Sequence, residues 1–279
     1  MLDNFAHGQN SLAAYCSNPD FEIVRGDCRD RFLMNELVKK ADIIIPLAAL
    51  VGAPMCKADA TAAISTNLDA VKMLCKLASK SQQIIIPNSN SGYGTSKEEC
   101  TEESPLNPLS LYAQTKADAE AVVMERENSI AFRLATVFGA SPRMRLDLLV
   151  NDFVLRAVRD CAIVLFEPYA MRNYIHVRDV AHAFLYAICG FERMKGNIYN
   201  AGDTRANCDK AYLCTAIQKH LADFRWHIGD GSDPDRRDYK VSNAKLEATG
   251  WHPLYTLDQG IVELIKLYKG LNERRYANA

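Results

Sequence analysis

The chain has 279 residues, of which 48% are hydrophobic and 24% charged. These are ordinary values for a globular protein, and they exclude a disordered, collagen-like or low-complexity chain. Its 33 basic and 34 acidic side chains give a formal net charge of −1, so charge gives no reason to expect nucleic acid or an anionic membrane as a partner. The length fits one large domain or a domain with a small companion.

Nine cysteines are scattered along the chain, and no two of them form a C-x-x-C pair. An odd number without paired spacing is typical of reduced thiols in the cytoplasm and argues against a disulfide framework or a zinc site. The longest apolar run, residues 43–51, is much shorter than a membrane span, and the N-terminus lacks the pattern of a signal peptide. The sequence therefore predicts a soluble cytoplasmic protein with no metal site.

Short apolar segments alternate with longer amphipathic segments through the first half of the chain. Strands are expected at residues 21–24, 42–47, 83–87 and 130–135. Helices are expected between them, at residues 29–39, 59–79 and 112–127. This alternation is typical of a parallel sheet with helices on both faces. The predicted fold class is α/β with a doubly wound parallel sheet.

The regular alternation ends near residue 141. Helices are expected at 148–158, 177–189, 208–222 and 257–268, and short strands at 163–166 and 174–175. We interpret residues 1–140 as the sheet domain and residues 141–279 as mainly a smaller cap, some segments of which return to the sheet. Such a cap would cover the carboxyl edge of the strands, where open α/β folds bind their ligands.

A tyrosine and a lysine stand four residues apart at the start of the third predicted helix. Tyr112 and Lys116 therefore share one helix face. A phenol has an ordinary pKa of about 10, which a neighbouring ammonium group lowers by stabilising the phenolate. The preceding buried strand ends near Ser89, whose hydroxyl would hydrogen-bond a substrate oxygen. The alternative is a surface pair on an amphipathic helix, with Ser89 and Asn90 satisfying turn backbone.

Further motifs occur in order along nearly the whole chain. They are LDN at 2–4, GDCRD at 26–30, LAA at 47–49, Asn67, SNSGYG at 89–94, ESPLNP at 103–108, RLATVFG at 133–139, RNYIHVRD at 172–179 and YNAG at 199–202. With Tyr112 and Lys116, this set resembles the extended short-chain dehydrogenase/reductases, specifically the NAD-dependent nucleotide-sugar epimerase/dehydratase family. The resemblance implies a Rossmann-like domain over residues 1–140 and a substrate-binding cap over residues 141–279.

The resemblance assigns the chemistry to three residues. Tyr112 would act as the acid/base that exchanges a proton with a sugar hydroxyl while a hydride passes to or from the nicotinamide of NAD. Lys116 would hold the nicotinamide ribose and lower the pKa of Tyr112. Ser89 would hydrogen-bond the same sugar oxygen.

The resemblance also implies which residues contact the cofactor NAD. Asp3, followed by Asn4, would bind the hydroxyls of the adenosine ribose, although a carboxylate here is equally suited to capping a helix. Asp27 and Cys28 would flank the adenine. The remaining cofactor-binding residues are Leu47, Ala48, Ala49, Asn67, Tyr112 and Lys116.

The implied substrate is a nucleotide-diphosphate sugar. Arg172 would clamp its diphosphate, a task suited to a planar bidentate cation. Arg145 and one of Arg236 or Arg237 are further candidates, and for each of these arginines the alternative is a solvated surface charge. The other expected substrate-binding residues are Asn90, Ser91 and Thr136. His176 and Asp179 are interpreted as structural groups that hold the turn of the cap.

Two positions depart from the pattern of the family's 4,6-dehydratases, in which an Asp-Glu pair supplies the acid and base for water elimination. Asn90 and Ser91 occupy those positions here, and neither side chain can act as a base. We therefore expect 4-epimerisation or keto-sugar reduction. Thr136, where many epimerases carry an asparagine, leaves the sugar unassigned. The alternative is a truncated, non-catalytic relative that binds nucleotide sugars or serves as a scaffold.

A glycine-rich dinucleotide fingerprint should lie about 20 residues before the ribose-binding acid. Asp3 is the third residue, and no glycine-rich match occurs elsewhere. We expect that this chain lacks the first, central strand and the helix N-terminus that receives the pyrophosphate. It would then bind NAD poorly, and a form extended upstream would bind it well.

A homodimer is also implied, formed through a bundle of the helix before the strand of Ser89 and the helix of Tyr112. The helix faces that would meet carry Val71, Leu74, Ala119 and Val122. The alternative is that these side chains belong to the core of a single chain.

Overall fold

A computed structural model describes residues 1–8, 11–231 and 237–270. The chain forms two units, each assembled from three stretches. Unit 1 consists of Met1–Gly92, Pro108–Arg133 and Ala187–Tyr199, and unit 2 of Tyr93–Asn107, Leu134–Tyr186 and Asn200–Ala279. Within the described ranges, no helix has the length and apolar character needed to cross a membrane. All nine cysteines are free thiols.

The main sheet of unit 1 has the strand order β3-β4-β5-β9. These strands are β3 (Ile43–Ile44), β4 (Gln83–Ser89), β5 (Ser129–Leu134) and β9 (Asn197–Ala201). β3 and β4 pair in parallel, with Ile43 opposite Gln83. The three successive isoleucines 84–86 of β4 are fully buried, as expected for a strand covered on both faces. The predicted α/β class with a parallel sheet is confirmed.

A second, two-stranded sheet stands apart from the main one. It pairs β1 (Leu2–Asp3) with β2 (Val24–Arg25) in parallel. In the described part of the chain, neither strand is hydrogen-bonded to the four-stranded sheet.

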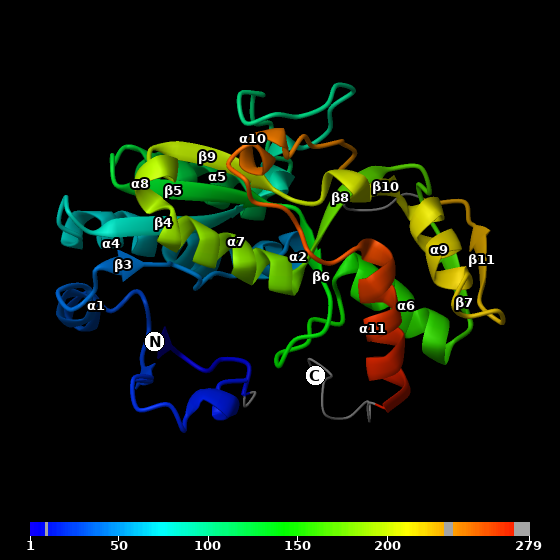
Figure 1. Cartoon of the computed structure of the whole chain (residues 1–279), viewed down its shortest axis with the longest axis horizontal. Helices are drawn as coiled ribbons and strands as arrows, with labels where there is room; N and C mark the ends of the chain where they lie inside the picture. Colours follow the sequence, from blue (N-terminus) through cyan, green and yellow to red (C-terminus); the bar gives the residue numbers. More distant parts are fainter. Residues whose placement is uncertain (9–10, 232–236, 271–279) are drawn as a thin grey trace. The chain divides into compact units, whose positions relative to one another are not determined.

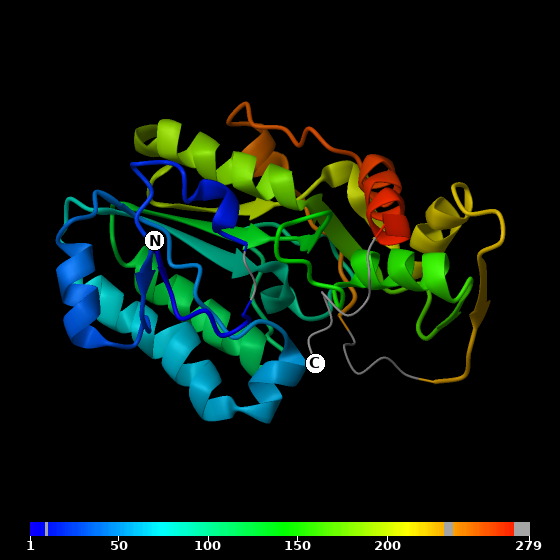
Figure 2. The same ribbon diagram turned by 90° about the horizontal axis from the view of Figure 1, so that it is seen from below.

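Three helices of unit 1 lie on one side of the main sheet (Figure 2). They are α1 (Arg31–Val38), α4 (Ala70–Leu77) and α5 (Leu111–Met124). Val71, Leu74 and Ala119 from these helices pack in one buried cluster with Ile84 and Ile86 of β4. The prediction that they form an exposed dimer face is therefore wrong, and the alternative of an intramolecular core holds for these three.

The remaining elements of unit 1 are short. The helices are α2 (Ala53–Ala58), α3 (Ala60–Ile64) and α8 (Phe191–Met194). The helical turns are η1 (Ala13–Tyr15) and η3 (Asn90–Tyr93), which are 3₁₀, and η2 (Ser65–Asp69), which is π-helical. The last residue of η3 belongs to unit 2. The single helix predicted at 59–79 is thus α3, η2 and α4 in succession. A π-helical turn within a helix is frequent at functional sites.

Unit 2 contains two small sheets, with orders β10-β8-β6 and β11-β7. Their strands are β6 (Thr136–Phe138), β7 (Ala162–Leu165), β8 (Met171–His176), β10 (Asn207–Asp209) and β11 (Arg225–Ile228). The helical elements are α6 (Leu149–Arg159), α7 (Val177–Cys189), which ends in unit 1, α9 (Lys210–Gln218), α10 (Ala244–Glu247), α11 (Leu257–Gly270) and the turn η4 (Thr204–Ala206). In Figure 1, α6, α9 and α11 lie beside one another near β7.

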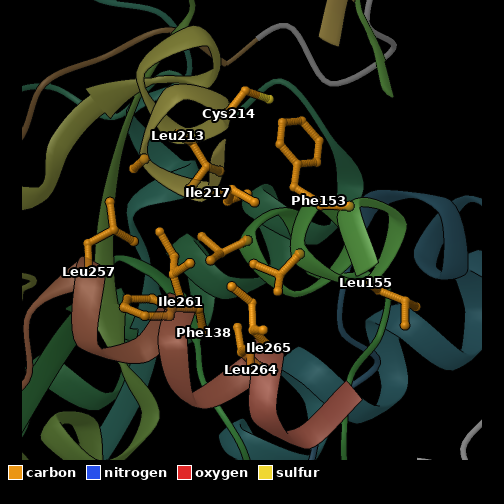
Figure 3. Packing of buried hydrophobic residues seen from close by; sticks show 14 of the residues in the cluster. Phe138, Phe153, Leu155, Leu213, Cys214, Ile217, Leu257, Ile261, Leu264 and Ile265 are labelled. Atoms are coloured by element: carbon orange, nitrogen blue, oxygen red, sulfur yellow. The ribbon is translucent and has the colours of Figure 1, made fainter. Parts of the chain in front are cut away.

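The core of unit 2 forms where these three helices meet. Figure 3 shows Ile261 and Leu264 of α11 facing the same interior as Ile217 of α9 and Phe138 of β6. Ile261, Leu264 and Ile217 are fully buried. Apolar residues repeat along α11 at three- and four-residue spacing, which places them on one helix face.

His176 and Asp179 hold the segment that enters α11. The Nε2 atom of buried His176 lies 2.7 Å from Oε2 of Glu263, and its ring stacks on Tyr255. The carboxylate of Asp179 accepts hydrogen bonds from the backbone N–H groups of Leu254 (2.8 Å) and Tyr255 (3.0 Å). The structural interpretation of both residues is confirmed.

Candidate active site in unit 1

Helix α5 places Tyr112 and Lys116 one turn apart at its N-terminal end. The helix begins after Ser110, whose hydroxyl accepts a hydrogen bond from the N–H of Ala113 (3.2 Å). α5 packs against β4, and it connects the end of β4 to the start of β5. A helix that joins two neighbouring strands of a parallel sheet runs antiparallel to them, so its first turn lies at the edge where β4 ends at Ser89.

Lys116 is a buried cation, with 7% of its surface exposed. Burial lowers the pKa of its ammonium group to about 8, although the negative charge of Glu120 acts in the opposite direction. A Lys ammonium group inside the protein interacts more strongly with a nearby phenolate than it would in water. The helix therefore offers Tyr112 the charge that its phenolate would need.

The end of β4 leaves buried polar atoms without hydrogen bonds. The hydroxyl of Ser89 accepts a hydrogen bond from the backbone N–H of Ser91 (3.2 Å). Asn90 is 1% exposed, and in the described part of the chain neither its side-chain nitrogen nor its oxygen has a hydrogen-bond partner; the same holds for Oγ of Ser91. Buried polar groups are normally satisfied, so a bound, hydroxyl-rich ligand is a chemically suitable partner.

The residues expected around the adenosine lie at the ends of β1 and β2. Asp3 Oδ1 accepts the N–H of Phe5 (2.7 Å), and Asn4 Oδ1 accepts the N–H of Ala6 (3.0 Å). Asp27 pairs with Arg29 (2.6 Å), and hydrogen bonds from this side chain lower the pKa of the carboxyl despite partial burial. Burial raises the pKa of the Cys28 thiol. Both aspartates therefore organise local turns, and neither caps a helix.

The segment after β3 and the π-helical turn are joined by Asn67. Its side-chain oxygen accepts the N–H of Leu50 (2.8 Å), and its nitrogen donates to the carbonyl of Leu50 (3.0 Å) and to Oγ1 of Thr115 (3.2 Å). Asn67 is 1% exposed, whereas Leu47 is 65% exposed and Ala48 is exposed as well. Asn67 thus links the loop that carries Leu47–Ala49 to Thr115 of α5, the residue next to Lys116.

Four residues predicted to bind substrate belong to unit 2. Thr136 opens β6, opposite Tyr174 of β8. Arg145 forms an ion pair with Asp147 (2.5 Å). Arg172 is buried, with its guanidinium group 5.8 Å from the ring centre of Tyr239.

The remaining arginine candidates follow the loop after β11. Arg236 lies outside the described residues, and Arg237, which is half-buried, follows it directly. The next residue, Asp238, accepts the N–H of Met171 (2.8 Å) and so ties this loop to β8 beside Arg172. A cavity of about 420 Å³ adjoins it, lined by Thr95, Glu167, Pro168, Tyr169, Ala170 and Asp238.

Sequence reasoning missed a buried charge network behind Lys116. Arg133 of β5 forms an ion pair with Glu120 of α5 (2.7 Å), and both side chains are nearly inaccessible. Two signals pointed to it: Glu120 follows Lys116 by four residues on the same helix face, and Arg133 is a charge within a predicted buried strand. A charge inside such a strand requires a partner.

Two solved structures of similar fold are those of sugar-nucleotide 4-epimerases. UDP-glucuronic acid 4-epimerase from Bacillus cereus, in complex with UDP-glucuronic acid and NAD, superposes with a TM-score of 0.83 at 18% identity, covering 96% of this chain and 90% of that one. UDP-glucose 4-epimerase from Thermus thermophilus, in complex with NAD, gives 0.80 at 21% identity, with coverage of 96% and 90%. These matches show the Rossmann-like α/β fold.

Sequence comparison extends over nearly the whole chain. The chain is 26% identical to the low-salt glycan biosynthesis protein Agl12 of Haloferax volcanii, over 96% of this chain and 89% of that protein. It is 25% identical to dTDP-D-glucose 4,6-dehydratase of Mus musculus, over 96% and 79%. The model of the NAD dependent epimerase/dehydratase family matches residues 2–202. The chain therefore belongs to the NAD dependent epimerase/dehydratase family.

Proposed function

We propose that the protein is an NAD-dependent nucleotide-sugar epimerase, or a related keto-sugar reductase. The observation that carries the proposal is that Tyr112 and the buried Lys116 lie one turn apart at the start of α5, at the sheet edge where β4 ends at Ser89. Membership in an NAD dependent enzyme family and the nucleotide sugars in the names of its relatives support it. When bound, NAD would accept a hydride from a sugar carbon and return it.

Residues of unit 1 would transfer the proton of the sugar hydroxyl. Tyr112 would remove it from the sugar hydroxyl and return it at the end of the cycle, and Lys116 would stabilise the phenolate in between. Ser89 would donate a hydrogen bond to the sugar oxygen as it becomes a carbonyl. Asn90 and Ser91 would hydrogen-bond the sugar, because their buried polar atoms are otherwise unsatisfied.

The cofactor and nucleotide would use the other expected residues. Lys116 suits the nicotinamide ribose of NAD, and Asp3 with Asn4 suits its adenosine ribose. Asn67 would contribute to the cofactor site by fixing the loop that carries Leu47–Ala49. Arg172 and Arg237 of unit 2 would bind the diphosphate of the substrate. Arg145, already paired with Asp147, is the weakest of these candidates.

The reaction is assigned to epimerisation or reduction instead of dehydration because of the side chains after Ser89. An amide and an unassisted hydroxyl, at Asn90 and Ser91, are not bases at neutral pH. Incubation with UDP-glucose and dTDP-glucose, followed by NMR of the products, separates a 4-epimer from a 4-keto-6-deoxy sugar. Formation of the keto-deoxy sugar would contradict the assignment.

Two variants test the role of Tyr112. Tyr112→Phe should abolish turnover while the fold stays intact, whereas Tyr212→Phe, at an exposed tyrosine of α9, should leave turnover unchanged. Turnover by Tyr112→Phe within a few-fold of the parent would refute the proton-transfer role. Measurement of NAD retained after purification distinguishes an enzyme from a non-catalytic relative.

We further propose a cytoplasmic location and a homodimer. The nine free cysteines support a reducing compartment. Because Val71, Leu74 and Ala119 are inside the core, a dimer contact would have to use other residues. Light scattering at micromolar concentration measures the oligomeric state.

A further inference from the structure

Glu120 lies one turn beyond Lys116 and two turns beyond Tyr112 on the same face of α5. Its carboxylate is 3% exposed and accepts hydrogen bonds from three nitrogens. Nη2 of Arg133 lies 2.7 Å from Oε1, Nε of Arg133 lies 3.1 Å from both oxygens, and Nδ2 of Asn88 lies 2.5 Å from Oε2. The carboxylate is therefore fixed from two sides.

These contacts connect three elements of unit 1. Glu120 belongs to α5, Asn88 to β4 and Arg133 to β5, and Asn88 is the residue immediately before Ser89. The bonds of Glu120 therefore set the position of α5 against the end of the strand that presents Ser89. A displacement of about 1 Å in such an arrangement is enough to lower a reaction rate by two orders of magnitude.

The charge of Glu120 also acts on Lys116. Burial lowers the pKa of Lys116, and the carboxylate of Glu120 opposes this effect. Two groups from other elements face Glu120 directly: Arg133 on β5, which is charged, and Asn88 on β4, which is neutral. Tyr112 is the titratable group one turn before Lys116 on α5. Without the carboxylate of Glu120, burial would lower the pKa of Lys116 further, and the ammonium group would lose its proton at a lower pH.

We propose that Glu120 is a positioning residue of the Tyr112–Lys116 pair. Its carboxylate, bound to Arg133 of β5 and Asn88 of β4, fixes the turn of α5 that carries Lys116 against the end of β4 and places a negative charge one turn from the ammonium group. The catalytic consequence rests on the proposed function, but the effect of Glu120 on Lys116 does not.

Two single variants separate this role from a purely structural one. Glu120→Gln and Arg133→Met each break the same buried ion pair, so a structural role predicts the same effect on Lys116. Positioning by charge predicts different effects: Glu120→Gln lowers the pKa of Lys116 by about one unit, and Arg133→Met does not lower it. Glu125→Gln, at an exposed position just after the helix, is the matched control and leaves the pKa unchanged.

The pKa of Lys116 is read by NMR of protein labelled with ¹³C at the lysine ε-carbon. The Lys116→Arg variant assigns the signal. If Glu120→Gln does not fold, the double variant Glu120→Leu/Arg133→Met removes both charges and restores apolar packing. A smaller decrease in the Lys116 pKa is then expected, because the positive charge of Arg133 is removed as well. An unchanged Lys116 pKa in the folded Glu120 variants, or an equal decrease in Arg133→Met, would overturn the proposal.

The pH profile of turnover supplies the second measurement. In Glu120→Gln, the alkaline limb of kcat should move to lower pH by the same amount as the Lys116 pKa, with little change in KM for the nucleotide sugar. If the parent protein converts no nucleotide sugar, the proposed function fails, while the NMR titration still decides the role of Glu120.

Discussion

The buried carboxylate of Asp179 gives the most direct test of how unit 2 is held together. Its two oxygens accept the backbone N–H groups of Leu254 and Tyr255, which lead into α11. Asp179→Ala leaves both N–H groups without this acceptor. Since a hydrogen bond to a charged group contributes about 1.5–3 kcal/mol, we expect the free energy of unfolding to fall by about 3–6 kcal/mol. Asp179→Asn keeps one acceptor oxygen and should lose about half as much.

Hydrogen exchange locates the effect, and chemical denaturation measures its size. In Asp179→Ala the amides of Leu254 and Tyr255 should exchange much faster than in the parent. Glu192→Ala, which removes an exposed ion pair with Lys195 (2.7 Å), is the control and should change stability by less than about 1 kcal/mol. Unchanged protection of both amides in the Ala variant would refute the reasoning.

Three further predictions concern unit 2. Partial burial opposes ionisation of Glu263, but its bond to His176 and neighbouring charges hold its pKa below the ordinary 4.5. The ionised carboxylate of Glu263 therefore stabilises the folded state above about pH 4.5, and this stabilisation is lost as the pH falls through the lower pKa that Glu263 has in the folded protein. In Glu263→Gln, the free energy of unfolding should depend less steeply on pH in the acid range. Ile261→Ala in the α11 core should cost about 2–5 kcal/mol in thermal unfolding, and a smaller loss would mean that the site collapses to fill the cavity. Gly139→Ala should lower the melting temperature, because the backbone has φ +111° and a Cβ would lie 2.4 Å from Nε2 of His176; an unchanged temperature would show that this ring is free to move.

The elements that the sequence predicted well are those with strong periodicity. α7 occupies the predicted residues 177–189, and β4 contains the predicted strand at 83–87. The strand predicted at 42–47 is only Ile43–Ile44 in the structure. A strand is defined by its hydrogen bonds to a neighbour and not by apolar residues, and among the described strands β3 has β4 as its single neighbour. β1, β6 and β10 are two or three residues long and carry no periodicity to detect.

The site was predictable where chemistry needs a fixed spacing. Tyr112 and Lys116 lie on one helix, so the four-residue interval determined their relation. The Glu120–Arg133 pair joins a helix to a strand, and no local pattern shows which two buried charges meet. The π-helical turn η2, which interrupts the helix predicted at 59–79, contains Asn67. The side chain of Asn67 is hydrogen-bonded to Leu50 and Thr115, and only the folded chain brings these residues together.

The separate β1–β2 sheet has a consequence for how unit 1 opens in solution. Only two residue pairs join its strands, Leu2 with Val24 and Asp3 with Arg25, and Met1 and Ile23 are exposed. β4, by contrast, has a neighbour on each side and a continuous buried run. Local opening free energies follow such differences in buried contacts. We expect the β1–β2 pair to unfold and refold many times during one lifetime of the main sheet, so that Asp3 and Asn4 move between ordered and disordered states while Ser89 stays fixed.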